Sequence, residues 1–334
     1  MVLGSKRAED IVAEFSNQRI LVVGDLMLDR YIFGEAERIS PEAPVPVVRV
    51  SEEREVPGGA SNVGLNIKTL GGEASLCGLT GKDFHGLQLR ELLLAAELDI
   101  GGVIEASGCP TTVKTRVLAQ RQQIVRIDRE NGDQPGKNDV TELLCAKVRE
   151  LADDATGIVI EDYGKGVIRQ AVVDTAISAA TDRGIPVGFD PKDNHELNIR
   201  GVTVATPNRK ETFDACGVRD KHPSPPPLED GVLIRAGATL LDRWGPKLLM
   251  TTLGANGMLL QAKDSPVRHV PTRAREVFDV SGAGDTVIAV CVLALAAGAD
   301  YFEAAELANF AAGVVVGKLG TATTSAEELL NFIA

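Results

Sequence analysis

Short apolar runs that alternate with helix-like segments recur along most of this 334-residue chain. Ile20–Gly24, Gly157–Glu161 and Val187–Asp190 are almost wholly apolar, which is typical of strands buried on both faces. The segments Thr141–Ala152 and Val167–Arg183, which lie between such runs, predict helices. Strands that alternate with helices predict an α/β fold, with a doubly wound, mostly parallel sheet and helices on both faces. Further helices are expected at 63–70, 208–216, 229–243, 285–297 and 303–319, and further strands at 202–206, 247–251, 257–261 and 267–271.

Four segments interrupt this alternation. Asp29–Gly34 and Val45–Val50 resemble strands separated by proline-punctuated residues, and Thr111–Leu118 and Gln123–Asp128 resemble a second hairpin. We expect them to form a small β-sheet lid, built from about 29–50 and 111–129, that covers the site. Because no repeat or linker divides the chain, residues 1–334 are expected to form one domain that carries this lid.

Composition excludes several classes of protein. The formal net charge of −12 argues against a nucleic-acid binder, which needs a basic surface to neutralise phosphates. Five scattered cysteines form no C-x-x-C pair, so a disulfide framework or a cysteine metal site is not expected. The N-terminus lacks a signal-peptide core and no apolar stretch reaches membrane-spanning length, so we expect a cytoplasmic protein without a membrane partner.

The segment Val280–Thr286 carries the strongest chemical signal. Gly282, Ala283 and Gly284 are small residues that allow backbone N–H groups to gather at the start of an apolar helix, where anions bind. An acid beside a bound phosphate is repelled, so Asp285 needs another purpose. It suits a general base that takes a proton while the amides hold the charge on a transferring group, which indicates phosphoryl transfer to a hydroxyl.

Two motifs near the N-terminus suit a sugar. Asp25 and Asp29 follow a buried strand, where paired carboxylates can accept hydrogen bonds from vicinal hydroxyls, although an Asx turn and a salt bridge would explain them equally simply. The glycines Gly58 and Gly59 permit close backbone approach to a ligand, with Asn62 in the first turn of the helix that follows. A tight turn capped by a serine is the alternative for this second motif.

Two further motifs suit a nucleotide and its metal. Asn208 and Glu211 have the spacing of a helix capping box, yet the same oxygens could hold waters around Mg²⁺. Thr252, Gly254 and Gly257 follow a predicted strand and could form either a nucleotide wall or a plain turn. The chain has no G-x-x-x-x-G-K-[ST] segment and no Gly-x-Gly after its first strand, which counts against P-loop kinases and dinucleotide-binding dehydrogenases.

Basic residues gather in the predicted lid, although the chain as a whole is acidic. They are Arg38, Lys114, Arg116, Arg121, Arg126 and Arg129. Such a cluster could grip an anionic substrate such as a sugar phosphate, with Arg116 and Arg126 as the candidates we select. A charged, solvated edge that discourages aggregation is the alternative interpretation.

Together these motifs resemble the ribokinase-like (PfkB) family of sugar kinases, over nearly the whole chain from Ile20 to about Leu319. The pair Gly58-Gly59 with Asn62 resembles the first signature of the family, and Asp279–Thr286 resembles the second. Asn208 to Glu211 resembles its N-x-x-E element. Three elements in the expected order make coincidence improbable.

The resemblance implies specific roles. ATP would be the phosphoryl donor, Asp285 the base, and the amides of Gly282–Asp285 the anion hole, while Asn208 and Glu211 would organise Mg²⁺ through waters. Asp279 and Ser281 would bind a monovalent cation such as K⁺, although Ser281 replaces a commoner threonine. The sugar would be held by Asp25, Asp29 and Asn62, and Asp190 and Lys192 could reach the sugar or a phosphate. A homodimer through the lid is also implied.

Within the family, the segments Gly24–Tyr31, Arg38–Val47, Glu161–Gly166 and Phe189–Lys192 resemble a subgroup that phosphorylates O1 of D-glycero-D-manno-heptose 7-phosphate. That reaction leads to ADP-heptose and the lipopolysaccharide core. The chain ends soon after the kinase region and has no H-x-G-H motif, so we expect a stand-alone kinase that needs a separate adenylyltransferase. The alternatives are a kinase for another sugar phosphate, such as fructose 1-phosphate or tagatose 6-phosphate, and a sugar-phosphate-binding regulator without catalytic activity.

Overall fold

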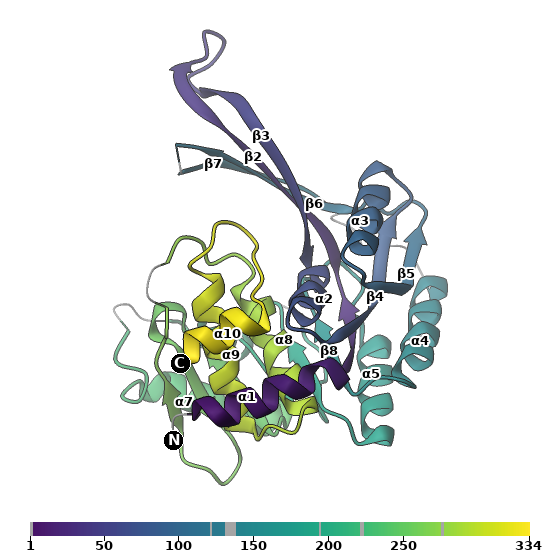
Figure 1. The fold of residues 1–334 in the computed structure, drawn as a ribbon, viewed down its shortest axis with the longest axis vertical. Coiled ribbons are helices and arrows are strands. Elements are labelled where there is room, and N and C mark those ends of the chain that lie inside the picture. The colour runs from purple at the N-terminus through teal and green to yellow at the C-terminus, as the bar shows by residue number, and fades with distance from the viewer. Residues whose placement is uncertain (1–2, 121, 131–137, 194, 221–223, 275–276) are drawn as a thin grey trace.

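A large sheet forms the centre of the computed structural model, which describes residues 3–120, 122–130, 138–193, 195–220, 224–274 and 277–334 (Figure 1). Within these residues the strand order is β13-β12-β11-β10-β9-β8-β1-β4-β5. The pairs from β5 to β11 are parallel, whereas β12 and β13 are added antiparallel at one edge. The bounds are β1 Arg19–Gly24, β4 Glu73–Gly81, β5 Asp99–Ala106, β8 Gly157–Glu161, β9 Val187–Asp190, β10 Val204–Ala205, β11 Leu248–Thr252, β12 Met258–Gln261 and β13 Arg268–Val270.

The sheet reverses its direction of growth between β1 and β8. From β1 the chain proceeds to β4 and β5 on one side, and it later returns to β8, β9, β10 and β11 on the other. Ligands of open α/β sheets bind at the carboxyl ends of the strands at such a switch point. The carboxyl ends here deliver Gly24 with Asp25, and Glu161 with Asp162, to one place.

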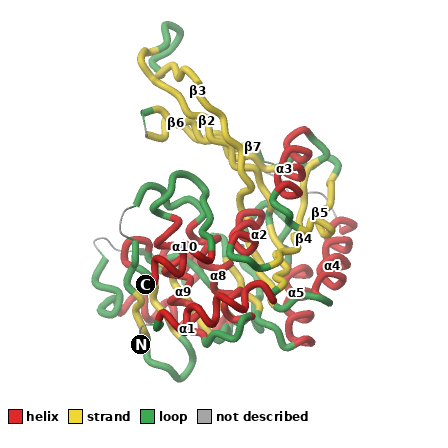
Figure 2. The backbone as a smooth tube through the Cα atoms, viewed as in Figure 1, coloured by secondary structure: helices red, strands yellow, loops and turns green. Residues whose placement is uncertain are grey.

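Helices cover both faces of the sheet because its strands bury side chains on both sides (Figure 2). In β1, Ile20 and Val22 join one core while Leu21 and Val23 join the other, as the two-residue period of a strand requires. The first core includes α2 and α8, and the second includes α4 and α5. The α-helices described are α1 Ser5–Ala13, α2 Ala60–Thr69, α3 Phe84–Ala95, α4 Asn138–Ala152, α5 Gln170–Arg183, α6 Arg209–Ala215, α7 Gly231–Trp244, α8 Ala283–Ala296, α9 Tyr301–Val315 and α10 Ala326–Ile333.

A second sheet, in the order β3-β2-β6-β7, extends away from the body (Figure 1). Its strands are β2 Leu26–Ile39, β3 Pro46–Gly59, β6 Thr112–Ala119 and β7 Gln122–Arg129. The inner ends of β2 and β3 are buried against the body, whereas their outer halves are largely exposed. We call this four-stranded sheet the lid. Arg121, one of the basic residues noted above, lies outside the described residues.

Several predicted boundaries agree with the structure. Gly157–Glu161 and Val187–Asp190 are strands with the predicted ends, and the doubly wound, mostly parallel sheet is confirmed. The first lid hairpin was predicted too short, because Glu35–Arg38 in β2 and Ser51–Glu55 in β3 are mostly polar and show no apolar alternation. Its strands are held instead by cross-strand pairs such as Arg30–Glu53 and Arg49–Glu35.

Other elements differ from the prediction. The last predicted helix, 303–319, begins at Tyr301, because Asp300 and Glu303 form a capping box there. It ends at Val315, where the N–H groups of Gly317 and Lys318 bond to carbonyls three residues earlier. The helix predicted at 63–70 begins earlier, at Ala60, directly after strand β3. No sequence prediction covered α1, α3, α10, β4 or β5. Among the described residues, no helix is both long and apolar enough to cross a membrane.

Candidate active site

In the described part of the chain, the first turn of α8 has unpaired backbone N–H groups and follows a required glycine. Gly282 precedes the helix with φ +78°, and a Cβ at this position would lie 2.8 Å from Nδ2 of Asn62, so both the backbone and the available space require glycine. Among the described residues, the backbone N–H groups of Gly282, Gly284 and Asp285 have no hydrogen-bond partner. These unpaired donors at a helix N-terminus favour a negatively charged group.

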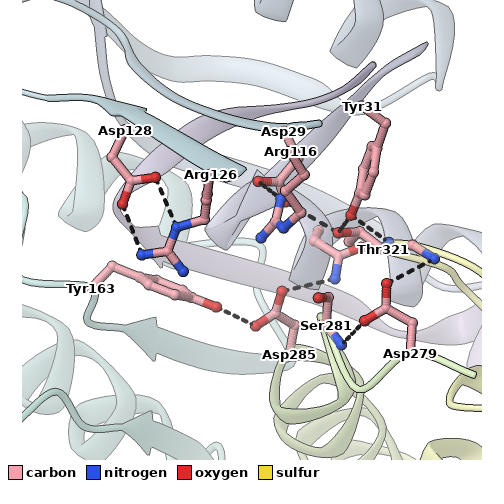
Figure 3. Close-up of polar contacts among 12 residues, drawn as sticks. Asp29, Tyr31, Arg116, Arg126, Asp128, Tyr163, Asp279, Ser281, Asp285 and Thr321 are labelled. Atoms are coloured by element: carbon pink, nitrogen blue, oxygen red, sulfur yellow. Dashed lines mark hydrogen bonds and ion pairs between the residues drawn. The ribbon is translucent and has the colours of Figure 1, made fainter. Parts of the chain in front are cut away.

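Asp285 is buried in that same turn and is held from two sides (Figure 3). The hydroxyl of Tyr163 donates to Oδ1 at 2.6 Å, and the amide Nδ2 of Asn62 donates to Oδ2 at 2.8 Å. Burial raises the pKa of Asp285, and the two hydrogen bonds oppose that rise because they stabilise the carboxylate. A buried carboxylate whose orientation is fixed in this way suits a general base.

A chain of buried amides and hydroxyls holds Asn62 in turn. Asn66, one turn further along α2, donates to the carbonyl of Asn62 at 2.9 Å. The hydroxyl of Thr286 donates to Oδ1 of Asn66 at 3.0 Å, which links α2 back to α8. The network therefore fixes the Asn62 amide against Asp285 through contacts between two helices. Sequence reasoning missed Asn66 and Thr286, because nothing local marks their contact across 220 residues.

Asp25 has a different environment from the one expected. Its carboxylate accepts hydrogen bonds from the backbone N–H groups of Tyr163, Lys165 and Val167, at 2.9 to 3.0 Å. The side chain is only 1% exposed. Asp25 therefore fixes the loop that carries Tyr163, and its burial disfavours the predicted contact with sugar hydroxyls.

A cavity of about 640 Å³ opens on the other side of the α8 turn. It brings together residues that were predicted to act in catalysis, to bind the nucleotide, and to reach the sugar or a phosphate. The predicted residues in its lining are Asp190, Lys192, Asn208, Glu211, Thr252, Gly254, Gly257, Gly282, Ala283, Gly284 and Asp285. The predicted residues outside the lining are Asp25, Asp29, Gly58, Gly59, Asn62, Arg116, Arg126, Asp279 and Ser281.

Asn208 and Glu211 form the capping box that their spacing allows. The Asn208 side chain accepts from the Glu211 N–H at 2.9 Å, and Oε2 of Glu211 accepts from the Asn208 N–H at 2.8 Å. A bridge between Asn208 and Thr252 brings this helix start beside the glycine-rich turn of the cavity. Burial raises the pKa of Glu211 to about 7. Asn208 and Glu211 therefore cap the start of α6, and Oε1 of Glu211 takes no part in the capping box.

Carboxyl groups crowd the strand ends beneath the cavity. Glu161 and Asp190 end adjacent strands and face each other in register. Glu161 is fully buried, and its carboxyl group lies close enough to that of Asp190 for a hydrogen bond when one of the two is protonated. Burial raises the pKa of both groups well above the ordinary range, and neighbouring carboxylates add to the rise. Two facing carboxyl groups with raised pKa values are suited to share one proton beside the cavity.

On the lid side of Asp285 the polar groups are paired with one another (Figure 3). Oδ1 of Asp29 accepts from Nη1 of Arg116 at 2.7 Å, and Oδ2 accepts from the Thr321 hydroxyl at 3.1 Å. The N–H of Thr321 also donates to the Tyr31 hydroxyl at 2.8 Å, which ties the lid to the C-terminal loop. A Cβ on Gly58 would lie 2.6 Å from Oδ2 of Asp29, so this glycine provides the space for that carboxylate.

Arg126 and Asp279 also have internal partners. Arg126 donates twice to Asp128 on its own strand, at 2.9 Å each. Asp279 accepts from the backbone N–H groups of Ser281 at 2.9 Å and Gly320 at 3.1 Å. Asp279 therefore joins the α8 turn to the C-terminal loop. Gly59 ends β3 directly before α2, in the left-handed region.

Tyr163 is the functional residue that sequence reasoning overlooked most clearly. It stood inside the quoted segment Glu161–Gly166, yet it received no role there. An aromatic residue directly after a buried strand and two acids was the available signal. The strand order, which brings the end of β8 to the start of α8, was needed to show that its hydroxyl meets Asp285.

Comparisons with known proteins agree with this geometry. Residues 17–328 match the model of the pfkB family carbohydrate kinases. The chain is 44% identical over 326 residues to the bifunctional protein HldE of Geobacter metallireducens, and 42% identical over 321 residues to that of Pasteurella multocida. These matches cover 98% and 96% of this chain but only 65% and 64% of the relatives. The chain thus spans about two thirds of their length.

Solved structures show the same fold at lower identity. Arabidopsis thaliana ribokinase, complexed with ribose and ATP, matches with a TM-score of 0.71 and 20% identity, over 95% of this chain and 98% of that one. Phosphofructokinase-2 from Escherichia coli, in complex with potassium, matches with a TM-score of 0.73 and 21% identity over the same shares. The ribokinase-like fold, a mostly parallel large sheet with a smaller second sheet, is therefore confirmed.

Proposed function

Because this chain belongs to the pfkB family of carbohydrate kinases, we propose that it transfers the γ-phosphoryl group of ATP to O1 of D-glycero-D-manno-heptose 7-phosphate. The product would be the 1,7-bisphosphate, a precursor of ADP-heptose and the lipopolysaccharide core. The observation that carries the reaction class is the position of Asp285. This buried carboxylate lies beside unpaired helix N–H groups, with a large cavity on one side and the lid on the other.

The chemistry follows from these neighbours. Asp285 takes the proton of the O1 hydroxyl while that oxygen forms a bond to the γ-phosphorus. The bond from the γ-phosphorus to the bridging oxygen breaks, and ADP leaves with its electron pair. The N–H groups of Gly282, Gly284 and Asp285 hold the negative charge of the transferring group. Tyr163 and Asn62 keep the carboxylate aimed at the hydroxyl.

The cavity residues fit a nucleotide with Mg²⁺. Asp190 and Glu211 offer carboxylate oxygens to the cavity, and one Glu211 oxygen is outside the capping box. In the described residues no three acidic, histidine or cysteine side chains form a metal cluster. Mg²⁺ commonly keeps several waters and uses one or two carboxylates with substrate phosphates, which suits Asn208 and Glu211 acting through waters. When bound, Mg²⁺ would neutralise charge on the phosphates.

Asp279 and Ser281 are our candidates for a monovalent cation, with K⁺ as the ion. Asp279 already joins the α8 turn to the C-terminal loop at Gly320. A cation beside that carboxylate would stabilise the junction, and with it the position of the turn that precedes Asp285. Dependence of activity on K⁺ tests this part of the proposal separately from the sugar substrate.

The sugar would lie between the α8 turn and the lid. Asp29 and Asn62 would contact its hydroxyls, with Gly58 and Gly59 beside them, and Lys192 and Asp190 would approach from the cavity side. The heptose assignment is supported by the resemblance of Arg38–Val47 and Glu161–Gly166 to kinases of that sugar phosphate. Arg116 and Arg126 would reach its phosphate by exchanging their partners Asp29 and Asp128.

The proposal includes one kinase domain and a homodimer formed through the lid. Several apolar lid side chains are exposed in the single chain: Ile39, Val45, Val50, Ile124, Val125 and Ile127. The lid sheet projects from the body (Figure 1). Exposed apolar side chains on such a sheet favour contact with another protein surface, and a second copy would provide a matching one. ATP as the donor is consistent with a cytoplasmic location.

A coupled kinase assay over a panel of sugars and sugar phosphates tests the function. We expect a strong preference for the heptose 7-phosphate over fructose 6-phosphate, fructose 1-phosphate and tagatose 6-phosphate. Equal activity on fructose 6-phosphate would contradict the heptose assignment and leave the kinase class intact. Binding of sugar phosphates without any phosphoryl transfer would favour the regulator alternative and contradict the role of Asp285.

A further inference from the structure

One face of the lid is turned toward Asp285, and the strand register identifies the charged residues on that face. Asp29 on β2 pairs with Lys114 on β6, which pairs with Asp128 on β7. Two residues further along, Tyr31, Arg116 and Arg126 are similarly aligned. Because side chains two apart in a strand share a face, all six lie on one side of the sheet. This face, which we call the inner lid face, carries three cations.

Two of these cations have carboxylate partners. Arg116 donates to Asp29 at 2.7 Å, and its side chain is only 13% exposed. Arg126 forms a two-bond pair with Asp128 at 2.9 Å, although it is half exposed. An anion that bound to either arginine would compete with a carboxylate already in place.

The third cation, Lys114, has no carboxylate within ion-pair distance among the described residues. Its Nζ lies 4.6 Å from the centre of the Tyr163 ring, the same tyrosine whose hydroxyl holds Asp285. Asp29 and Asp285 attract Lys114 across longer distances, whereas Lys165 and Arg116 repel it. Burial lowers the pKa of Lys114, since the ammonium is partly removed from water.

Lys165 provides an internal comparison. It belongs to the loop after β8, close to Lys114, but its Nζ lies 2.5 Å from Oε2 of Glu130. Of these two neighbouring lysines, one is neutralised by a carboxylate and the other rests on an aromatic face. A half-buried ammonium between two cations, without its own counter-ion, would gain most from an incoming anion.

We propose that Lys114 binds a phosphate group of a substrate at the reaction centre, beside Tyr163 and Asp285. This inference rests on the proposed kinase function and identifies the cation that would recognise its phosphorylated ligand. The phosphate has two chemical sources. It is either the monoester already present on the sugar or the group that passes from ATP to the hydroxyl.

The test is steady-state kinetics of Lys114→Met, Lys114→Arg and the matched control Lys165→Met. Each variant is assayed with the heptose 7-phosphate and with the same heptose lacking its phosphate. Loss of one charge-assisted contact corresponds to roughly a 10- to 100-fold effect. We expect an effect of that size in Lys114→Met, partial recovery in Lys114→Arg, and a change below about threefold in Lys165→Met.

The two sources give different patterns. A rise in KM for the phosphorylated sugar alone, with kcat and the KM for ATP little changed, identifies the phosphate of the sugar. A fall in kcat with both sugars identifies the transferring group. Unchanged kinetics in a Lys114→Met protein that unfolds at the wild-type temperature overturn the proposal, and so does an equal effect in Lys165→Met.

A second measurement separates this inference from the proposed function. If the wild-type protein phosphorylates no sugar phosphate, the proposed function fails, yet inorganic phosphate can still probe Lys114. We expect the ³¹P resonance of inorganic phosphate to broaden when the wild-type protein or Lys165→Met is added. With Lys114→Met the broadening should be much smaller. Equal broadening with all three proteins contradicts the role of Lys114.

Discussion

Charged groups in the body of the protein and in its lid are held in different ways. In the body, backbone N–H groups hold two carboxylates near the site: three of these groups donate to Asp25 and two donate to Asp279. In the lid, side chains hold one another, as in the pairs Arg116–Asp29 and Arg126–Asp128. Asp25 and Asp279 are therefore fixed to the backbone, whereas the lid carboxylates can exchange partners.

This difference suits the two halves of a transfer reaction. The chemical groups must be held in one geometry, and a carboxylate bound by backbone N–H groups cannot turn without breaking several hydrogen bonds at once. A site for an anionic substrate must release its internal ion pairs when the ligand arrives. Asp285 lies at the boundary, with one side toward the cavity and Tyr163 connecting it to Lys114 of the lid.

The largest effect is expected at Asp285. In Asp285→Asn the new amide can still bond to Asn62 and Tyr163, but it cannot take a proton. We expect kcat to fall by about 10²- to 10⁴-fold while ATP binding is little changed. Turnover by rapid quench and nucleotide titration measure the two quantities, and near-normal turnover would remove Asp285 from the mechanism.

The next effect tests the body alone. Asp25→Ala leaves the N–H groups of Tyr163, Lys165 and Val167 without their acceptor, so we expect the free energy of unfolding to fall by about 2–4 kcal/mol. Urea denaturation measures it. A loss below about 0.5 kcal/mol, the size usual for a surface change, would show that the backbone contacts do not fix this loop.

Tyr163→Phe should change the pH dependence. The Tyr163 hydroxyl stabilises the charged form of Asp285, so its removal raises the pKa of that carboxylate further. The base must be ionised, and activity is lost as pH falls through its pKa. We therefore expect the acidic limb of the kcat/KM profile to move to higher pH. A shift to lower pH, or none, contradicts the proposed contact.

The smallest effect is expected in the lid. Arg126 is half exposed, and within the described part of the chain its side chain bonds only to Asp128, so Arg126→Ala should change the free energy of unfolding by less than about 1 kcal/mol. Arg116→Ala leaves the buried Asp29 without its cation and should cost more. Parallel urea titrations compare the free energies of unfolding of the two variants. An equal loss in both would show that the stability of a lid ion pair does not depend on its burial.

Sequence alone predicted the parts whose cause is local. An apolar run bounded by small residues defined Gly157–Glu161, and the small residues before Asp285 predicted a helix start, which the structure has at Ala283. The capping box of Asn208 and Glu211 follows from their spacing in the sequence. The same spacing also allowed a Mg²⁺ site to be proposed as the second interpretation.

The remainder depends on contacts between distant segments. Thr321 meets Asp29 and Tyr31 across about 290 residues, and no local pattern distinguishes that threonine from its neighbours. The role of Asp25 was also hidden, because its partners are backbone groups of a loop 138 to 142 residues away. Strand alternation placed Lys114 and Arg116 on one face, but only the observed ion pairs show which cation lacks a partner.

Identification of the product tests the central claim most directly. The wild-type protein is incubated with ATP, Mg²⁺ and D-glycero-D-manno-heptose 7-phosphate, and the products are followed by ³¹P NMR, with Asp285→Asn in parallel. We predict a new phosphomonoester signal coupled to the anomeric proton, an unchanged 7-phosphate, and almost no new signal in the variant. A phosphate on any other oxygen, or an equal yield from Asp285→Asn, would contradict the account.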